Sequence, residues 1–329
     1  MLLLAGDIGG TNTRLRLVQA GNEGTSLITV NEAVYPSSKD GLVSIVEMFL
    51  GKEAKPDKAC FALAGPVLNN KCKLTNLPWP ELDGELLQQE LNIPKVNLIN
   101  DFVAVGYNIV LEEEGNKTLE TLQIGEPSKL APIVIIGAGT GLGQAFAIPQ
   151  GNSYQVFPTE GGHVDFAPQN ELEEELLQYL RGKGKVKVDV ERVVAGPGIV
   201  EIFQFLHARK FSGEPVEDII AQDDLAKAIA QGAEEGNVIC QETMQIFVEA
   251  YGAAVGNVAV SFLPFGGIYI AGGIAAQNIN LMKNGRFMEA FKNKARVNPL
   301  LLEKIPVHIV LNTLEGLTGA VKYAAKIMS

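Results

Sequence analysis

The stretch of sequence that decides the fold is Leu3–Leu15, LLAGDIGGTNTRL. The apolar run Leu2–Ala5 predicts a buried strand, and the alternation of Arg and Leu that opens Arg14–Val18 predicts a half-exposed strand. The glycine-rich turn between them, GDIGGTN, predicts that the two strands form a hairpin.

The same unit recurs at Pro132–Ile148, where the apolar run PIVII is followed by the turn GAGTGLG and the strand QAFAI. Two copies in one chain indicate two related lobes that face each other. Chance resemblance between two glycine-rich hairpins is the alternative.

The rest of the chain interleaves short apolar runs with helical patterns, which predicts an α/β fold. Further strands are expected at Cys60–Ala64, Val96–Ile99, Ile268–Ala271 and Val307–Leu311. Helices are expected at Gly41–Leu50, Glu81–Leu91, Leu172–Arg181, Val190–Ala208, Asp224–Gln231, Val238–Leu263, Leu281–Ala290 and Leu317–Ile327. In the longest of these helices Gly252 and Gly256 share one face, which indicates close packing against a neighbouring element.

The first turn carries a carboxylate, Asp7, beside Gly9, Gly10 and Thr11. Backbone N–H groups in such a turn suit phosphate oxygens, but a carboxylate would repel a bare phosphate unless a divalent cation lay between them. Mg²⁺ prefers one or two carboxylates together with substrate phosphates. The turn is therefore interpreted as a metal–nucleotide site. The alternative is an ordinary hairpin in which Asp7 is only a turn former.

The second turn fits neither common nucleotide-binding signature. A G-x-G-x-x-G pattern that starts at Gly137 needs glycine where the chain has Leu142, and a Walker A loop needs a final G-K-[ST]. The backbone of this turn can still hold phosphates, from the side opposite to the first turn.

Polar side chains follow the predicted strands. Asn100 and Asp101 end the run VNLI, where α/β proteins place ligand-binding groups, although a helix N-cap also explains them. Glu160 and His163 are separated by two glycines, so both side chains can turn toward one site. A lone core histidine is the alternative, and the absence of nearby cysteine argues against zinc. Glu191 lies near a predicted helix start, where the helix dipole alone favours an acid.

Composition narrows the class of function. The 27 Lys and Arg against 38 Asp and Glu give a net charge of −11, which argues against nucleic-acid and anionic-membrane partners. Much of the glycine, 35 residues in all, falls in short clusters at turns and not in linkers. Three cysteines suit a reducing compartment, and the start MLLLAGD lacks the pattern of a signal peptide.

Pro264 and a glycine pair interrupt the uncharged stretch Ala250–Met282, so a buried helix and strand are expected there instead of a membrane span.

Taken together, these features suit the transfer of a phosphoryl group from Mg-ATP to a polyhydroxyl acceptor. The chain closely resembles the bacterial glucokinase family in six motifs between Leu3 and Ile274, and the later segment EGLTGA fits as well. In order, the motifs are LLAGDIGGTNTRL, LINDFVAVGY, IGAGTGLGQA, TEGGHVDFAP, ERVVAGPGI and GGIYIAGGI.

This resemblance implies an α/β, two-lobed actin-like ATPase fold of the ribonuclease H-like type, with a sugar and ATP cleft between the lobes. It implies a small lobe over residues 1–112, a large lobe over residues 113–313, and a C-terminal helix over residues 314–329 that returns to the small lobe. It also implies a cytoplasmic homodimer that acts in glycolysis.

The same resemblance assigns the site residues. It implies that Asn100, Asp101, Glu160, His163 and Glu191 bind glucose, with Asp101 as the general base for the 6-hydroxyl. ATP is expected at Gly6, Asp7, Ile8, Gly9, Gly10, Thr11, Gly137, Gly139, Thr140, Gly272 and Gly273, with Mg²⁺ near Asp7, bound through water.

Several alternatives stay open. The related repressor/ORF/kinase family shares the DIGGT turn, but its kinases carry a zinc-binding cysteine cluster where this chain has VDFAPQN, and its repressors carry an N-terminal helix-turn-helix for which Asp7 leaves no room. The zinc-free branch is therefore expected. A kinase of a related hexose, one that uses polyphosphate or ADP, a non-catalytic sugar-binding regulator and an NAD-binding oxidoreductase are the other candidates.

Overall fold

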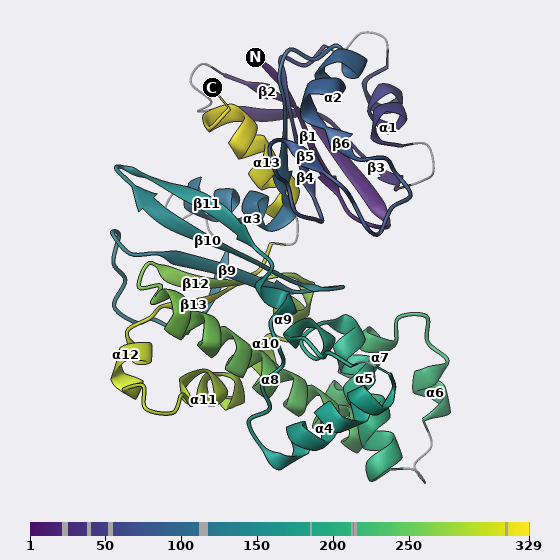
Figure 1. The fold of residues 1–329 in the computed structure, drawn as a ribbon, viewed down its shortest axis with the longest axis vertical. Helices are drawn as coiled ribbons and strands as arrows, with labels where there is room; N and C mark the ends of the chain where they lie inside the picture. Colours follow the sequence, from purple (N-terminus) through teal and green to yellow (C-terminus); the bar gives the residue numbers. More distant parts are fainter. Residues whose placement is uncertain are drawn as a thin grey trace. The chain divides into compact units, whose positions relative to one another are not determined.

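The computed structural model describes residues 1–21, 26–37, 41–51, 55–111, 118–184, 186–211, 213, 216–312 and 315–328. The chain divides into two compact units (Figure 1). The first comprises Met1–Lys117, Ala145–Pro158 and Leu314–Ser329, and the second comprises Thr118–Gln144 and Thr159–Thr313. The lobe limits expected near residues 112 and 313 fall outside the described residues and stay predictions.

The first unit is built on a five-stranded sheet with the order β3-β2-β1-β4-β7. Its strands are β1 (Leu2–Ile8), β2 (Asn12–Ala20), β3 (Leu27–Pro36), β4 (Lys58–Leu63) and β7 (Val96–Asn100). β2 is antiparallel to β1 and β3, whereas β1, β4 and β7 are parallel. The helices are α1 (Gly41–Leu50), α2 (Gly84–Leu91), α3 (Asp101–Leu111) and α13 (Glu315–Lys326), and a short β5 (Lys71–Cys72) pairs with β6 (Leu82–Asp83).

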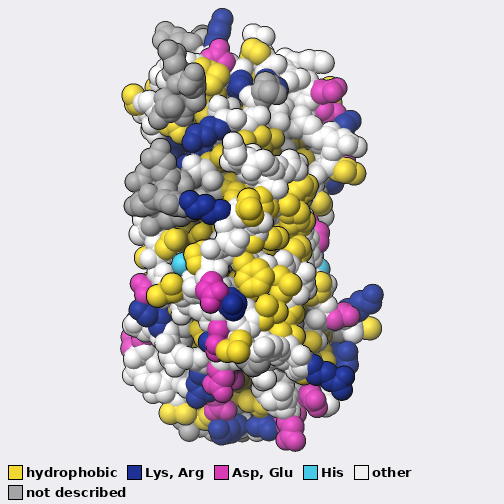
Figure 2. Space-filling view, turned by 90° about the vertical axis from the view of Figure 1, so that its left-hand side faces the viewer, with side chains coloured by type: hydrophobic (Ala, Val, Ile, Leu, Met, Phe, Trp, Pro, Cys, Tyr) yellow, Lys and Arg dark blue, Asp and Glu magenta, His cyan; other side chains and the backbone are white. Residues whose placement is uncertain are grey.

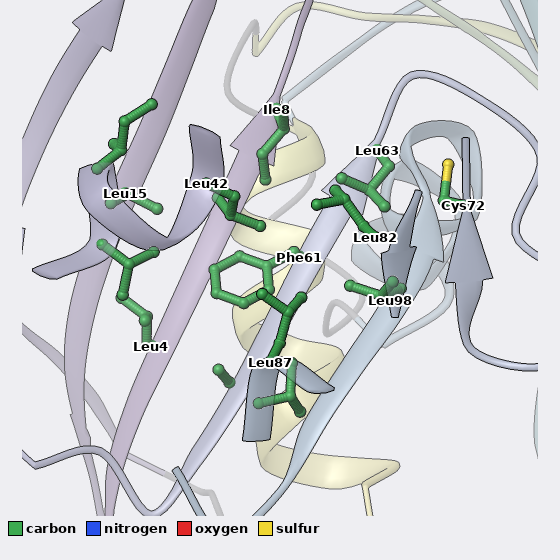
Figure 3. Packing of buried hydrophobic residues seen from close by; sticks show 14 of the residues in the cluster. Leu4, Ile8, Leu15, Leu42, Phe61, Leu63, Cys72, Leu82, Leu87 and Leu98 are labelled. Carbon is green, nitrogen blue, oxygen red and sulfur yellow. The ribbon is translucent and has the colours of Figure 1, made fainter. Parts of the chain in front are cut away.

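Alternate residues of β1 point to two different cores. Leu4 and Ile8 face α1 and α2, in a cluster that also contains Phe61 and Leu87 (Figure 3). On the other face α13 packs on β1 and β4, and it approaches α3 so closely that a Cβ on Gly319 would lie 1.8 Å from the carbonyl oxygen of Ala104. The sheet is therefore covered on both sides, which explains why its parallel strands read as continuous apolar runs.

The other large sheet has six strands in the order β11-β10-β9-β12-β13-β8. These are β8 (Leu119–Gln123), β9 (Ile133–Ala138), β10 (Leu142–Gln150), β11 (Ser153–Thr159), β12 (Gly267–Ala271) and β13 (Val307–Val310). The helices of the second unit are α4 (Glu171–Gly182), α5 (Gly196–Arg209), α6 (Glu217–Ile220), α7 (Leu225–Glu234), α8 (Val238–Phe262), α9 (Gly273–Gln277), α10 (Ile279–Met282), α11 (Arg286–Lys292) and α12 (Pro299–Glu303). Two 3₁₀ turns, η2 (Gly161–His163) and η3 (Val190–Arg192), complete it.

Both predicted hairpins are confirmed, with β1 and β2 around the first glycine turn and β9 and β10 around the second. The uncharged stretch after Ala250 is a buried helix followed by a buried strand, as expected. No helix in the described part of the chain is long and apolar enough to cross a bilayer. On the face drawn in Figure 2, the described Lys and Arg side chains are scattered among Asp and Glu side chains.

Three helix predictions are wrong in where the helix begins or in its continuity. The helix expected from Val190 begins only at Gly196, where Pro197 supplies an early helical position, and Val190–Arg192 is a separate 3₁₀ turn. The helix expected over Leu281–Ala290 is two helices, because Gly285 between them has φ +99°. Finally, α2 begins at Gly84 and not at Glu81, because the Asp83 side chain caps it.

The glycine pair of α8 permits the close packing that its spacing predicted. A Cβ on Gly252 would lie 2.2 Å from the carbonyl oxygen of Phe287, and one on Gly256 would lie 2.4 Å from that of Phe291. Both partners belong to α11 and are also four residues apart, so one turn of α8 meets one turn of α11.

Gly252→Ala is expected to destabilise the protein by about 1–3 kcal/mol, because the new methyl group must push α11 away from α8. Gly182→Ala is the matched control, since a Cβ there would meet nothing within 4 Å. Thermal unfolding of both variants measures the difference. Equal melting temperatures for the two variants would contradict the assigned packing.

Candidate active site

Three parallel strands of the first unit end at one edge of the sheet. The register pairs Ile8 of β1 with Leu63 of β4, and Leu63 with Asn100 of β7. Asp7 therefore lies one residue before this edge, and Asp101 lies one residue after it. The sheet brings together the two acids that the sequence analysis had placed in separate motifs.

The first glycine turn is compact. The Gly9 amide donates to the Asn12 carbonyl oxygen at 3.0 Å, and the Ser37 hydroxyl donates to the Gly9 carbonyl oxygen at 2.7 Å. A Cβ on Gly10 would lie 2.7 Å from the Asn76 side-chain nitrogen, so a larger residue here would require the exposed Asn76 side chain to move. Gly6 has a different constraint, because a Cβ there would lie 2.7 Å from the Phe61 ring. Glycine at position 6 is thus explained by core packing alone.

Asp7 lies against a cation of the same hairpin. Its Oδ2 is 3.6 Å from Arg14 Nη1. Burial raises the pKa of the Asp7 carboxyl above its ordinary value, and the Arg14 guanidinium lowers it in part. An incompletely compensated carboxylate suits a divalent cation. No group of three or more His, Cys, Asp and Glu within the described ranges is arranged to hold a metal by itself.

Asp101 opens helix α3 immediately after β7. Its Oδ1 accepts hydrogen bonds from the Phe102 amide and from Asn100 Nδ2, each at 2.9 Å. Burial raises the pKa of the Asp101 carboxyl to about 6; the Phe102 amide opposes this rise, and the negative charge of Asp7 adds to it. A carboxyl with this pKa can accept a proton near neutral pH and return it to water.

Asn100 has the capping role that the sequence analysis gave as an alternative for this pair. Its Oδ1 accepts from the amides of Phe102 and Val103 at 3.0 and 3.2 Å, and its Nδ2 donates to the Gly65 carbonyl oxygen at 3.2 Å. These bonds connect the ends of β4 and β7 and hold Asp101 in place. The capping of α3 by Asn100 is therefore compatible with a ligand-binding role for Asn100 and Asp101.

The second glycine turn is held by Glu191. Glu191 Oε2 accepts the Leu142 amide at 2.8 Å, and a Cβ on Gly141 would lie 2.6 Å from the same oxygen. The Gly196 amide donates to the Gly139 carbonyl oxygen at 2.8 Å. One Glu191 oxygen thus already has a structural partner, and its sugar contact stays a prediction.

The remaining predicted glycines lie at the same edge as this turn. β9 and β12 are parallel, with Ala271 paired to Gly137, so both strands end side by side. Gly272 has φ +86°, and a Cβ there would lie 2.6 Å from the Ala138 carbonyl oxygen. Both facts require glycine at this position.

A cavity of about 880 Å³ adjoins the second turn within the second unit. Gly139 and Thr140 line one part of it, and residues of α5, α7 and α9 line the rest. Its volume is in the range of sites that bind drug-sized ligands.

Glu160 and His163 lie together, as the glycines between them predicted. His163 Nε2 is 3.8 Å from Glu160 Oε2, and His163 Nδ1 is 3.0 Å from Asp189 Oδ2. His163 is about half exposed, which excludes the lone core histidine. Asp189 was missed by the sequence analysis. The only local signal was an acid directly before a helical pattern, which predicts a cap but not a contact with a residue 26 positions earlier.

Strands that end in two glycine turns, one beside a carboxylate and one beside a cavity, define an α/β protein of the actin-like ATPase class. The glucokinase family model matches residues 4–327, and the chain belongs to this family. It is 51% identical to a glucokinase of Trichormus variabilis over 99% of both chains, and 44% identical to one of Synechocystis sp. over 98% of both.

Solved structures agree with this assignment. A glucokinase from an Antarctic psychrotroph is 29% identical and matches 98% of both chains with a TM-score of 0.79. A glucokinase from Balamuthia mandrillaris in complex with glucose matches 98% of this chain and 93% of its own, with a TM-score of 0.82. At 21% identity, the latter likeness supports the fold alone.

Proposed function

We propose that the protein transfers the γ-phosphoryl group of ATP to the 6-hydroxyl of glucose and yields glucose 6-phosphate and ADP. The observation that carries the proposal is Asp101, a carboxyl with pKa about 6 held at the strand edge beside Asp7. Curated glucokinases at 44–51% identity over nearly the full length support the same activity.

In the proposed step the 6-hydroxyl oxygen attacks the γ-phosphorus while the bond from that phosphorus to the bridging oxygen of ADP breaks. Asp101 accepts the hydroxyl proton. Phosphoryl transfer has a loose transition state, so positioning and charge neutralisation contribute more than the strength of the base. Asn100 holds Asp101 through its Nδ2, and this contact aims the carboxylate at the sugar.

The other predicted residues bind the two substrates. Glu160, His163 and Glu191 are proposed to accept and donate hydrogen bonds at the sugar hydroxyls. The turns Gly9–Thr11 and Gly139–Thr140 are proposed to bind ATP phosphates through the amides of Gly10, Thr11 and Thr140 and the hydroxyls of both threonines, because the Gly9 and Gly139 amides donate within their own turns. Asp7 would hold Mg²⁺ through water, and the ion would supply positive charge that neutralises the ATP phosphates.

The cellular location, the oligomeric state and the metabolic role are also proposals. We expect a cytoplasmic homodimer that acts in glycolysis, on the basis of the resemblance stated above. The three cysteines, all free and buried, support a reducing compartment. Light scattering of the purified protein measures the oligomeric state.

A coupled assay of the wild-type protein tests the function and separates it from its alternatives. Glucose, mannose and fructosamine are each offered with ATP, ADP or polyphosphate, with and without Mg²⁺. We expect the highest kcat/KM with glucose and Mg-ATP. A higher value with another sugar or donor would replace the proposal by the corresponding alternative, and no turnover with any pair would favour a sugar-binding regulator.

Glu160→Gln is expected to raise the KM for glucose by about 10–100-fold, because a hydrogen bond to a charged group is worth about 1.5–3 kcal/mol. The KM for ATP should stay unchanged. Glu171→Gln is the matched control, an exposed glutamate in the first turn of α4. An unchanged KM for glucose in Glu160→Gln would remove Glu160 from the sugar site.

A further inference from the structure

The ring of His163 lies between two carboxylates. Nδ1 is 3.0 Å from Asp189 Oδ2, which is a hydrogen bond, whereas Nε2 is 3.8 Å from Glu160 Oε2, which is too far for one. An ionised carboxylate only accepts hydrogen bonds, so Nδ1 must carry a proton. The contact with Asp189 therefore selects the tautomer and leaves Nε2 for a ligand.

The backbone fixes this contact from both sides. The Phe166 amide donates to the Val188 carbonyl oxygen, and the Val190 amide donates to the Val164 carbonyl oxygen, each at 2.9 Å. These bonds flank an antiparallel bridge between Asp165 and Asp189. The segment after His163 and the segment that carries Asp189 are thus tied together over three residues.

The two oxygens of Asp189 have different partners. Oδ1 accepts the Arg192 amide at 3.1 Å and caps η3, while Oδ2 accepts from His163. The cap needs only a short polar side chain, which serine provides as well as aspartate. An aspartate at this position supplies one more acceptor and a charge, and both are directed at His163. The Asp189 side chain is 27% exposed, against 60% for Glu160, so its contact is the better shielded of the two.

We infer that Asp189 is a positioning residue: it holds His163 so that Nε2 is directed at a sugar hydroxyl, from which it accepts when the ring is neutral and to which it donates when the ring is protonated. The inference rests on the proposed function for the identity of the ligand. The arrangement of Asp189 and His163 itself does not depend on that function.

The charges around His163 act in the same direction. The carboxylates of Asp189, Glu191 and Glu160 raise the pKa of His163 above its ordinary value, mainly through the Asp189 hydrogen bond, and partial burial opposes this rise. A raised histidine pKa keeps the ring protonated below it, and the Nε2 proton is lost as the pH rises through it. Below this pKa Nε2 donates to a sugar hydroxyl oxygen, and above it Nε2 accepts from the hydroxyl.

The test uses Asp189→Ser and Asp189→Asn in the full-length protein. Serine keeps the cap and removes the partner of His163, whereas asparagine keeps the shape and an acceptor and removes the charge. The chain has three histidines, so ¹⁵N imidazole NMR can follow each titration, with His163→Gln to assign the signal. The KM for glucose and kcat are measured over the same pH range.

We expect the His163 midpoint to move to lower pH in both variants, with the signals of His207 and His308 unmoved. We expect the KM for glucose to rise about threefold to tenfold in Asp189→Ser, with kcat at saturating glucose unchanged. An unmoved midpoint overturns the inference, and so does a moved midpoint with an unchanged KM. If the wild-type protein fails to phosphorylate glucose, the proposed function fails, while the NMR midpoint still decides whether Asp189 acts on His163.

Discussion

Asp101→Asn is expected to lower kcat by about 10²–10⁴-fold, the usual contribution of a general base. Asparagine has nearly the same shape, and its amide oxygen can still accept the Phe102 amide, so the start of α3 should stay intact. What it lacks is the ability to accept the proton of the 6-hydroxyl. Coupled detection of glucose 6-phosphate measures kcat, and calorimetry measures glucose binding.

Asp83→Asn is the matched control. Asp83 is a helix-capping carboxylate in the same unit, paired with Lys71 at 2.7 Å, and asparagine caps a helix equally well. We expect this variant to retain wild-type kcat. If Asp101→Asn also retains it while glucose binds normally, Asp101 has no role as a base.

The pH profile gives a second test of the same role. Because the pKa of Asp101 is raised to about 6, the base is protonated and inactive below that pH, and kcat/KM should rise through it. The raised pKa also means that the fold loses stability as the pH rises from about 4 to about 6, and that this loss is fully present above pH 6. Asp101→Asn should therefore stabilise the protein by about 1–3 kcal/mol at pH 7, and this gain should disappear near pH 4.

The sequence predicted those helices and strands whose local pattern of apolar and turn residues agrees with their surroundings in the fold. Both glycine hairpins, helix α1 and the buried strand β7 were predicted from the spacing of apolar residues and from the turn residues. Helix α3 was not predicted, because every residue of Val103–Ile109 is buried and the segment shows no amphipathic pattern of apolar and polar residues. Strand β3 was missed for the opposite reason, since most of it is exposed on both faces and shows no alternation.

Some features of the site could likewise be predicted from the sequence, and others could not. Asp7 and Asp101 could be chosen from sequence because each directly follows or ends an apolar run, and parallel pairing then brings them to one edge. The contact of Asp189 with His163 could not be predicted, since it depends on a backbone bridge between segments 24 residues apart, at Asp165 and Asp189. The hydrogen bond from the Leu142 amide to Glu191 also joins segments that are distant in the sequence, so it could not be predicted either.

Asp7→Asn is expected to lower kcat/KM for ATP by about 10²-fold or more, because a metal ion supplies several kcal/mol of charge stabilisation in the transition state. The first reason to expect a metal ion is the net charge of the chain. A protein of net charge −11 that binds a polyanionic nucleotide must rely on backbone N–H groups and a cation more than on lysines. Asp7 is the carboxylate at the first glycine turn, and its charge is only partly balanced by Arg14.

The measurement that identifies this role is the Mg²⁺ concentration for half-maximal rate at fixed ATP, which should rise in Asp7→Asn and stay unchanged in Asp83→Asn. The variant should not lose thermal stability, because burial already disfavours the charge that it removes. These two readouts separate the metal role from the turn-former alternative. If Asp7 were only a turn former, Asp7→Asn would leave the Mg²⁺ requirement unchanged, and any loss of rate would parallel a loss of stability.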